Sequence, residues 1–156
     1  YKRQVSDSGA DFVILRTSWL YGKNGQCFPR SIARRLLSGH VISVVDDQFG
    51  QPTWTSDLAR IVIAHSLNNF EERVVHAVSS GQTSWYEFAL AIRESMGFAT
   101  VPEIRSVQSS EFQTIAARPS YSVLENKQTQ GPVLGNWLER WRIAAPEVLQ
   151  LSQKTM

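Results

Sequence analysis

Residues 11–22, DFVILRTSWLYG, decide the fold. Their first part, residues 12–15, is an apolar run rich in β-branched side chains and too short for a buried helix. The run does not alternate with polar residues, which is typical of a strand covered on both faces in a parallel sheet. In such sheets ligands bind beyond the carboxyl ends of the strands, where Thr17, Ser18 and Trp19 would lie. Hydroxyl groups after a strand can equally cap the next turn, so the residues alone leave both interpretations open.

Helical and strand patterns alternate along the rest of the chain, which predicts an α/β fold. Ser84 followed by Glu87 is a capping box, and it should open a helix that ends at Gly97. Thr55 or Ser56 can cap another helix that runs to residue 68. The remaining patterns predict helices over 28–37, 124–129 and 136–145, strands over 41–45, 73–78 and 101–107, and a helical turn over 109–112. Loops or turns are expected over 1–10, 21–26, 46–51 and 116–124, with a final turn starting at Pro146.

Composition narrows the class of protein. A chain of 156 residues with 42% hydrophobic content predicts one globular domain. The net charge of +2 and the lack of any basic run longer than Arg34-Arg35 give no reason to expect nucleic-acid binding. No apolar run approaches the roughly 20 residues of a membrane span, and no signal peptide opens the chain. The single cysteine, Cys27, suits a reducing compartment, so we expect a cytoplasmic protein; the three histidines lack metal-ligand spacing.

Five stretches of the chain stand out as motifs. They are RTSWLYG at 16–22, DQFGQPT at 47–53 with DLA at 57–59, TSWYEFA at 83–89, ARPSYSVL at 117–124 and the helix containing Trp137 and Trp141. In this order they resemble dTDP-4-dehydrorhamnose reductases, which are extended short-chain dehydrogenases/reductases. The resemblance covers most of residues 11–150, and its specificity comes from the shared order of the motifs.

The resemblance implies an amino-terminal dinucleotide-binding half with a glycine-rich turn and a Tyr-x-x-x-Lys pair. Neither Gly-x-x-Gly-x-x-Gly nor Tyr-x-x-x-Lys occurs in this sequence, and the spacing of Tyr1-Lys2 is wrong for that pair. The family's usual spacing would place the catalytic lysine just before residue 1. We therefore interpret the chain as the carboxyl-terminal half of a Rossmann-type reductase. Residues 1–22 would be the residual strand and turn of the dinucleotide-binding sheet, and residues 23–156 a small α+β substrate-binding domain.

The same resemblance assigns roles to individual residues. Trp19 would face the sugar, because a sugar ring stacks well on an indole, unless it merely fills the core. Thr17 and Ser18 would lie near the nicotinamide carboxamide of NADPH or NADH. Arg118 would bind the diphosphate, because a guanidinium offers two parallel donors to phosphate oxygens, unless it is an ordinary surface arginine.

The family also places the loop containing Asp47, Gln48 and Gly50 at the substrate pocket, although any hairpin can use such residues. Cys27 stands where the family often has Asn, which removes an amide donor. No residue of this chain is assigned as catalytic. Four aromatic residues with helical spacing are expected in the core: Trp85, Tyr86, Trp137 and Trp141.

The sequence is compatible with two functions. In the first, the chain is the substrate-binding half of an NAD(P)H-dependent dTDP-4-keto-sugar reductase of rhamnose biosynthesis, inactive alone because it lacks a positioned proton donor. In the second, it is a non-catalytic binding or structural remnant, or a regulatory subunit of the same family. Its expected partners are a dTDP-sugar and either an amino-terminal half or a second copy in a homo-oligomer.

Overall fold

Pairs of short strands form the framework of the chain. The computed structural model describes residues 2–68, 71, 73–97, 102–112, 118–125 and 130–150. Within these residues three pairs are parallel: β1 (Ile14–Arg16) with β6 (Val74–His76), β2 (Leu20–Tyr21) with β5 (Thr53–Trp54), and β3 (Ile42–Val45) with β8 (Ile104–Val107). The fourth pair, β4 (Phe49–Gly50) with β7 (Thr83–Ser84), is antiparallel.

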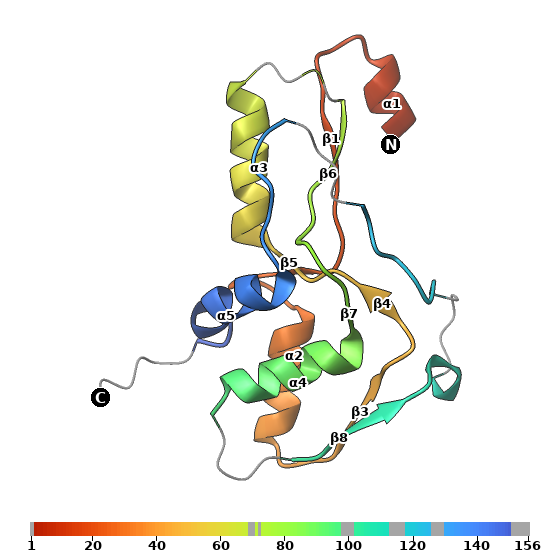
Figure 1. Ribbon diagram of the computed structural model, residues 1–156, viewed down its shortest axis with the longest axis vertical. Coiled ribbons are helices and arrows are strands. Elements are labelled where there is room, and N and C mark those ends of the chain that lie inside the picture. Colours follow the sequence, from red (N-terminus) through yellow and green to blue (C-terminus); the bar gives the residue numbers. More distant parts are fainter. Residues whose placement is uncertain are drawn as a thin grey trace.

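The helices surround these strands in two groups (Figure 1). In the upper part of that view, α3 (Thr55–Leu67) and the short α1 (Lys2–Asp7) accompany β1 and β6. In the lower part, α2 (Phe28–Leu37) packs on α4 (Trp85–Ser95), which also contacts β3 and β8. Between them, α5 (Trp137–Val148) packs on β5 and α4, and the 3₁₀ turn η1 (Ser109–Glu111) follows β8.

The larger core cluster lies between α2, α4, α5 and the short strands. Trp141 of α5, Phe88 of α4 and Tyr21 of β2 meet there, with ring centroids 5.3–5.7 Å apart. Ile32 and Leu36 of α2 reach the same cluster, while Arg34 and Arg35 stay exposed. The amphipathic pattern of residues 28–37 therefore buries the face that its spacing predicts, and the helix has the predicted bounds.

Several other sequence predictions are confirmed. The first strand pairs in parallel, and the strand expected over 41–45 is β3. Ser84 caps α4, accepting the Glu87 N–H at 3.1 Å, while the Glu87 carboxylate accepts the Ser84 N–H at 2.9 Å. Within the described part of the chain no helix is long and apolar enough to cross a bilayer.

Other predictions are wrong or incomplete. Residues 1–10 are not simply a loop, because α1 forms there; it buries no side chain, so it leaves no apolar periodicity to detect. Thr55 and Ser56 do not cap α3. The helix begins at Thr55, and its N-cap residue is Trp54, whose side chain makes no capping hydrogen bond. The turn expected at residues 21–22 overlaps β2, and residues 12–15 are half-buried rather than fully covered.

The carboxyl-terminal predictions are also modified. Pro146 lies inside α5, near its end, instead of starting a new turn. Leu124 and Glu125 lie outside any helix, and the rest of the helix expected over 124–129 lies outside the described residues.

Candidate functional site

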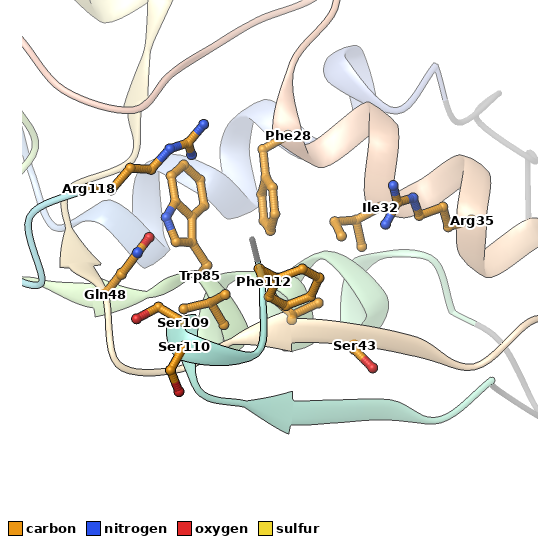
Figure 2. Close-up of a pocket in the computed structure, with 12 residues that line it drawn as sticks. Phe28, Ile32, Arg35, Ser43, Gln48, Trp85, Ser109, Ser110, Phe112 and Arg118 are labelled. Atoms are coloured by element: carbon orange, nitrogen blue, oxygen red, sulfur yellow. The ribbon is translucent and has the colours of Figure 1, made fainter. Parts of the chain in front are cut away.

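A groove of about 980 Å³ runs along α2 (Figure 2). The first turns of α2 form one wall of the groove, and β3 lies along it. The opposite wall is formed by η1 and Phe112, the residue that follows it. Trp85, Gln48 and Arg118 gather at one end. The lining residues are Phe28, Ile32, Arg35, Ser43, Val44, Val45, Gln48, Trp85, Ser109, Ser110, Phe112 and Arg118.

Among the described residues that line the groove, the charged side chains are all arginines. Arg118 and Arg35 lie at opposite ends of the groove in Figure 2, and no acidic side chain lines it. Both arginines are exposed, and neither guanidinium has a hydrogen-bond or ion-pair partner among the described residues. Two unpaired guanidiniums beside apolar walls suit an anionic ligand that also carries flat, weakly polar groups.

Aromatic rings form the inner wall at the Arg118 end. The indoles of Trp85 and Trp19 are stacked, with centroids 3.5 Å apart and planes 9° from parallel. Phe28 meets Trp85 on a tilted plane, with centroids 4.6 Å apart. Trp85, which the helical spacing assigned to the core, is half-buried and lines the groove, whereas Trp141 is fully buried as expected.

The predicted acidic loop shapes the groove from behind. The Asp47 carboxylate accepts the backbone N–H of Ser109 at 3.0 Å and its hydroxyl at 2.8 Å. Ser109 lines the groove, whereas Asp47 does not. Asp47 therefore fixes the wall opposite α2, while Gln48 beside it faces the groove.

The residues predicted to meet a cofactor lie at the carboxyl end of β1, outside the groove lining. The Ser18 hydroxyl donates to the Gln51 carbonyl at 2.9 Å. The Thr17 hydroxyl is buried and has no hydrogen-bond partner within the described residues. Ser18 is thus engaged within the fold, and contact of Thr17 or Ser18 with a cofactor stays a prediction.

Trp19 and Gly50 also lie outside the lining. Gly50 lies directly against the Trp19 ring, and Trp19 is stacked behind Trp85. Of the predicted substrate residues, Gln48 and Arg118 come together in the groove, while Asp47, Gly50 and Trp19 support its walls. Direct contact between these residues and a ligand stays a prediction.

Sequence reasoning missed other groove residues. The sequence marks Arg35 only as part of a short basic run and Phe112 only as the end of a helical turn. The apolar pattern of α2 identifies its buried face, but it cannot identify a second, partly covered face opposite η1. Long-range contacts put that face beside a groove: β3 pairs with β8, and residues 46–47 bond to residues 106–109.

Outside the groove, a buried ion pair connects α3 with α5. The Arg140 guanidinium donates to both Asp57 carboxylate oxygens at 2.7 Å, which raises the pKa of Arg140. Burial, and then the negative charge of Asp57, raise the pKa of the nearby Tyr21, although Arg140 opposes the shift. Within the described residues no three metal-ligating side chains come together.

Comparisons with known proteins agree on one family. The family model described as the RmlD substrate binding domain matches residues 2–154. The spore coat polysaccharide biosynthesis protein SpsK of Bacillus subtilis is 39% identical over 140 residues, covering 90% of this chain and 47% of that protein. The dTDP-4-dehydrorhamnose reductase of Mycobacterium tuberculosis is 39% identical over 118 residues, covering 74% of this chain and 38% of its own length.

Solved structures give the same result. A dTDP-4-dehydrorhamnose reductase from Clostridium acetobutylicum has a TM-score of 0.85 at 31% identity, covering 96% of this chain and 53% of that one. The enzyme of the same name from Bacillus anthracis, solved in complex with NADP, has a TM-score of 0.79 at 30% identity, with coverages of 92% and 50%. The chain thus spans about half the length of the relatives that it matches. Its α/β fold matches part of the extended short-chain reductase fold, and the chain belongs to the RmlD substrate-binding-domain family.

Proposed function

We propose that this chain is the substrate-binding part of an NAD(P)H-dependent dTDP-4-dehydrorhamnose reductase and that its groove binds a dTDP-sugar. The observation that carries the proposal is the pair of unpartnered arginines, Arg118 and Arg35, at the ends of an aromatic groove without acidic lining among the described residues. The relatives named as dTDP-4-dehydrorhamnose reductases support the choice of substrate.

The groove chemistry suits each part of a nucleotide sugar. The diphosphate needs a guanidinium, which Arg118 can supply with two donors. The base and the sugar each present a flat or weakly polar face that packs on aromatic rings such as those of Trp85, Phe28 and Phe112. The Gln48 amide and the hydroxyls of Ser109 and Ser110 can bond to sugar or base oxygens.

The cofactor would meet this chain at the carboxyl end of β1. Its nicotinamide ring would supply the hydride for reduction. By the family resemblance Thr17 and Ser18 would lie near the carboxamide, and residues 1–22 would belong to the cofactor-binding sheet. The sequence holds no glycine-rich turn for the pyrophosphate and no Tyr-x-x-x-Lys pair, so we expect binding without turnover from this chain alone.

Calorimetry with dTDP tests the proposal. The unaltered chain should bind dTDP, and Arg118→Ala should weaken binding by about 1.5–3 kcal/mol, the usual contribution of a charge-assisted hydrogen bond. Arg142→Ala is the matched control, because Arg142 is an exposed arginine of α5 outside the groove. Equal dissociation constants for Arg118→Ala and the unaltered chain would remove Arg118 from the site, and no binding of dTDP by the unaltered chain would overturn the proposed function.

A further inference from the structure

Trp19 lies at a sharp change of direction between two strand pairs. The Arg16 carbonyl accepts the Ala77 N–H at 2.7 Å beside β6, and the Trp19 carbonyl accepts the Thr53 N–H at 3.2 Å beside β5. Between these two anchors the backbone of Trp19 has a φ of 44°, in the left-handed region. A side chain there costs about 1–2 kcal/mol, so its neighbours must hold the residue in place.

Gly50 covers one face of the Trp19 indole. A Cβ atom built on Gly50 would lie 2.3 Å from Cε2 and 2.6 Å from both Cζ2 and Nε1. Cζ2 and Nε1 are the ring atoms on either side of Cε2, and the Cβ atom would be equally far from both and farther than from Cε2. Gly50 therefore approaches the indole from above its plane, not from its edge. Trp85 lies only 3.5 Å from the Trp19 ring, so a Cβ atom on that side would have atoms of Trp85 among its nearest neighbours. The three nearest atoms all belong to Trp19 instead, so Gly50 lies on the face opposite Trp85.

Trp85 covers the opposite face, and its position is fixed by the fold. The β4–β7 pairing aligns Gly50 with Thr83, two residues before Trp85. The Ser84–Glu87 capping box then sets the first turn of α4, which begins at Trp85. The Trp19 indole is thus held between Gly50 and Trp85, and neither of its faces is free to stack on a ligand.

We infer that Trp85, not Trp19, is the indole that stacks on a ring of the nucleotide sugar, and that Trp19 braces Trp85 from behind. Trp85 lines the groove at the end where Arg118 lies, whereas Trp19 is absent from the lining (Figure 2). A ring on Trp85 and a phosphate on Arg118 would be neighbouring parts of one ligand. The inference rests on the proposed function, and it moves the stacking role from Trp19 to a residue of α4.

Two probe ligands, dTDP and dTDP-rhamnose, test the assignment by calorimetry. Trp85→Ala should weaken binding of at least one probe about tenfold, the usual effect of removing a stacked aromatic ring, and Trp85→Phe should restore most of it. Weaker binding of both probes would place the base on Trp85, and weaker binding of dTDP-rhamnose alone would place the sugar there. Trp137→Phe, a half-buried tryptophan outside the groove, should change neither dissociation constant.

Bracing by Trp19 has its own readout. Stacked indoles couple in near-ultraviolet circular dichroism, so Trp19→Phe and Trp85→Phe should remove the same spectral feature without any ligand present. Gly50→Ala should weaken it as well, because the added methyl group would clash with the Trp19 ring, which already contacts Trp85 and can only be displaced from the stack. Different lost features for the two tryptophan variants would overturn the bracing role.

Different results would overturn the proposed function and the role of Trp85. If the unaltered chain binds neither probe, the proposed function fails and the ligand-stacking role fails with it. If Arg118→Ala weakens binding while Trp85→Ala, folded by far-ultraviolet circular dichroism, leaves both dissociation constants unchanged, the groove is the binding site and only the assignment of Trp85 is overturned.

Discussion

The buried carboxylate of Asp57 depends on a single strong partner. Its side chain is 2% exposed, and Arg140 satisfies both oxygens from α5, while the more distant Arg60 reaches it at 3.8 Å. The Arg140 guanidinium also lies 5.6 Å from the centre of the Trp54 ring. Removing Arg140 would leave the buried Asp57 carboxylate without its main partner, so this ion pair ties α5 to the first turn of α3.

Tyr21, beside this ion pair, should make stability fall at high pH. Burial holds the pKa of the folded state above the ordinary value of 10.0, so above pH 10 the unfolded chain loses a proton that the folded chain keeps. The free energy of unfolding should therefore decrease as the pH rises above about 10. Tyr21→Phe should remove this decrease, as measured by urea unfolding between pH 7 and 11.

At neutral pH the same substitution should change the free energy of unfolding by less than about 1 kcal/mol, because the Tyr21 hydroxyl has no hydrogen-bond partner in the described part of the chain. Tyr121→Phe is the control: Tyr121 is exposed, and its variant should keep the high-pH decrease. Parallel curves for Tyr21→Phe and the unaltered chain would show that Tyr21 does not cause the effect.

Motif residues were found from the sequence more easily than the surfaces that they build. Short motifs identify Gln48 and Arg118, and both line the groove. The place of Trp19 after a strand predicts a stacking platform, but no local pattern shows that Gly50 and Trp85 cover its faces. Those contacts join residues 31 to 66 positions apart, a range over which periodicity carries no information.

At the scale of elements, helix α4 organises the lower part of the molecule. It packs on α2, α5, β3 and β8, and its first residue reaches the groove. The capping box at Ser84 satisfies two backbone N–H groups that would otherwise lack partners at this buried helix end. The cap thus supports both the core and the candidate site.

Ser84→Ala should lower the free energy of unfolding by about 0.5–2 kcal/mol, the usual cost of losing a side-chain cap. Chemical denaturation at pH 7 measures it. Ser66→Ala is a suitable comparison, because Ser66 is exposed on α3 and, among the described residues, bonds to the Ile63 carbonyl of its own helix. Equal losses for the two variants would mean that the cap contributes nothing beyond a local serine contact.

Elements with strong local signals were predictable, whereas strand partners were not. The bounds of α2 and the cap of α4 follow from spacing within a few residues. The two-residue strands β2, β4, β5 and β7 are too short for any alternating pattern, and they exist because distant segments pair with them. No local pattern shows that β1 pairs with β6 or that β3 pairs with β8.

At the scale of the whole molecule, the upper part keeps apolar side chains in water. Ile63 and Leu67, one turn apart on α3, are 56% and 78% exposed, and Val74 of β6 is 54% exposed. Within the described residues β1 pairs on one side only, with β6, and Phe12 is covered by the Arg73 guanidinium at 5.7 Å from its ring centre. An open strand edge beside exposed apolar residues favours pairing with another polypeptide.

We therefore expect the chain to form dimers or larger assemblies through its upper part, since burying one such side chain is favourable by about 1.5–3 kcal/mol. Sedimentation velocity over a concentration series measures this. Leu67→Lys and Phe12→Lys should both shift the equilibrium toward monomer. Leu37→Lys should not, because Leu37 is similarly exposed, at 69%, but lies on α2 in the lower part. A monomer at high micromolar concentration, with stability unchanged by Phe12→Lys, would show that this edge needs no partner.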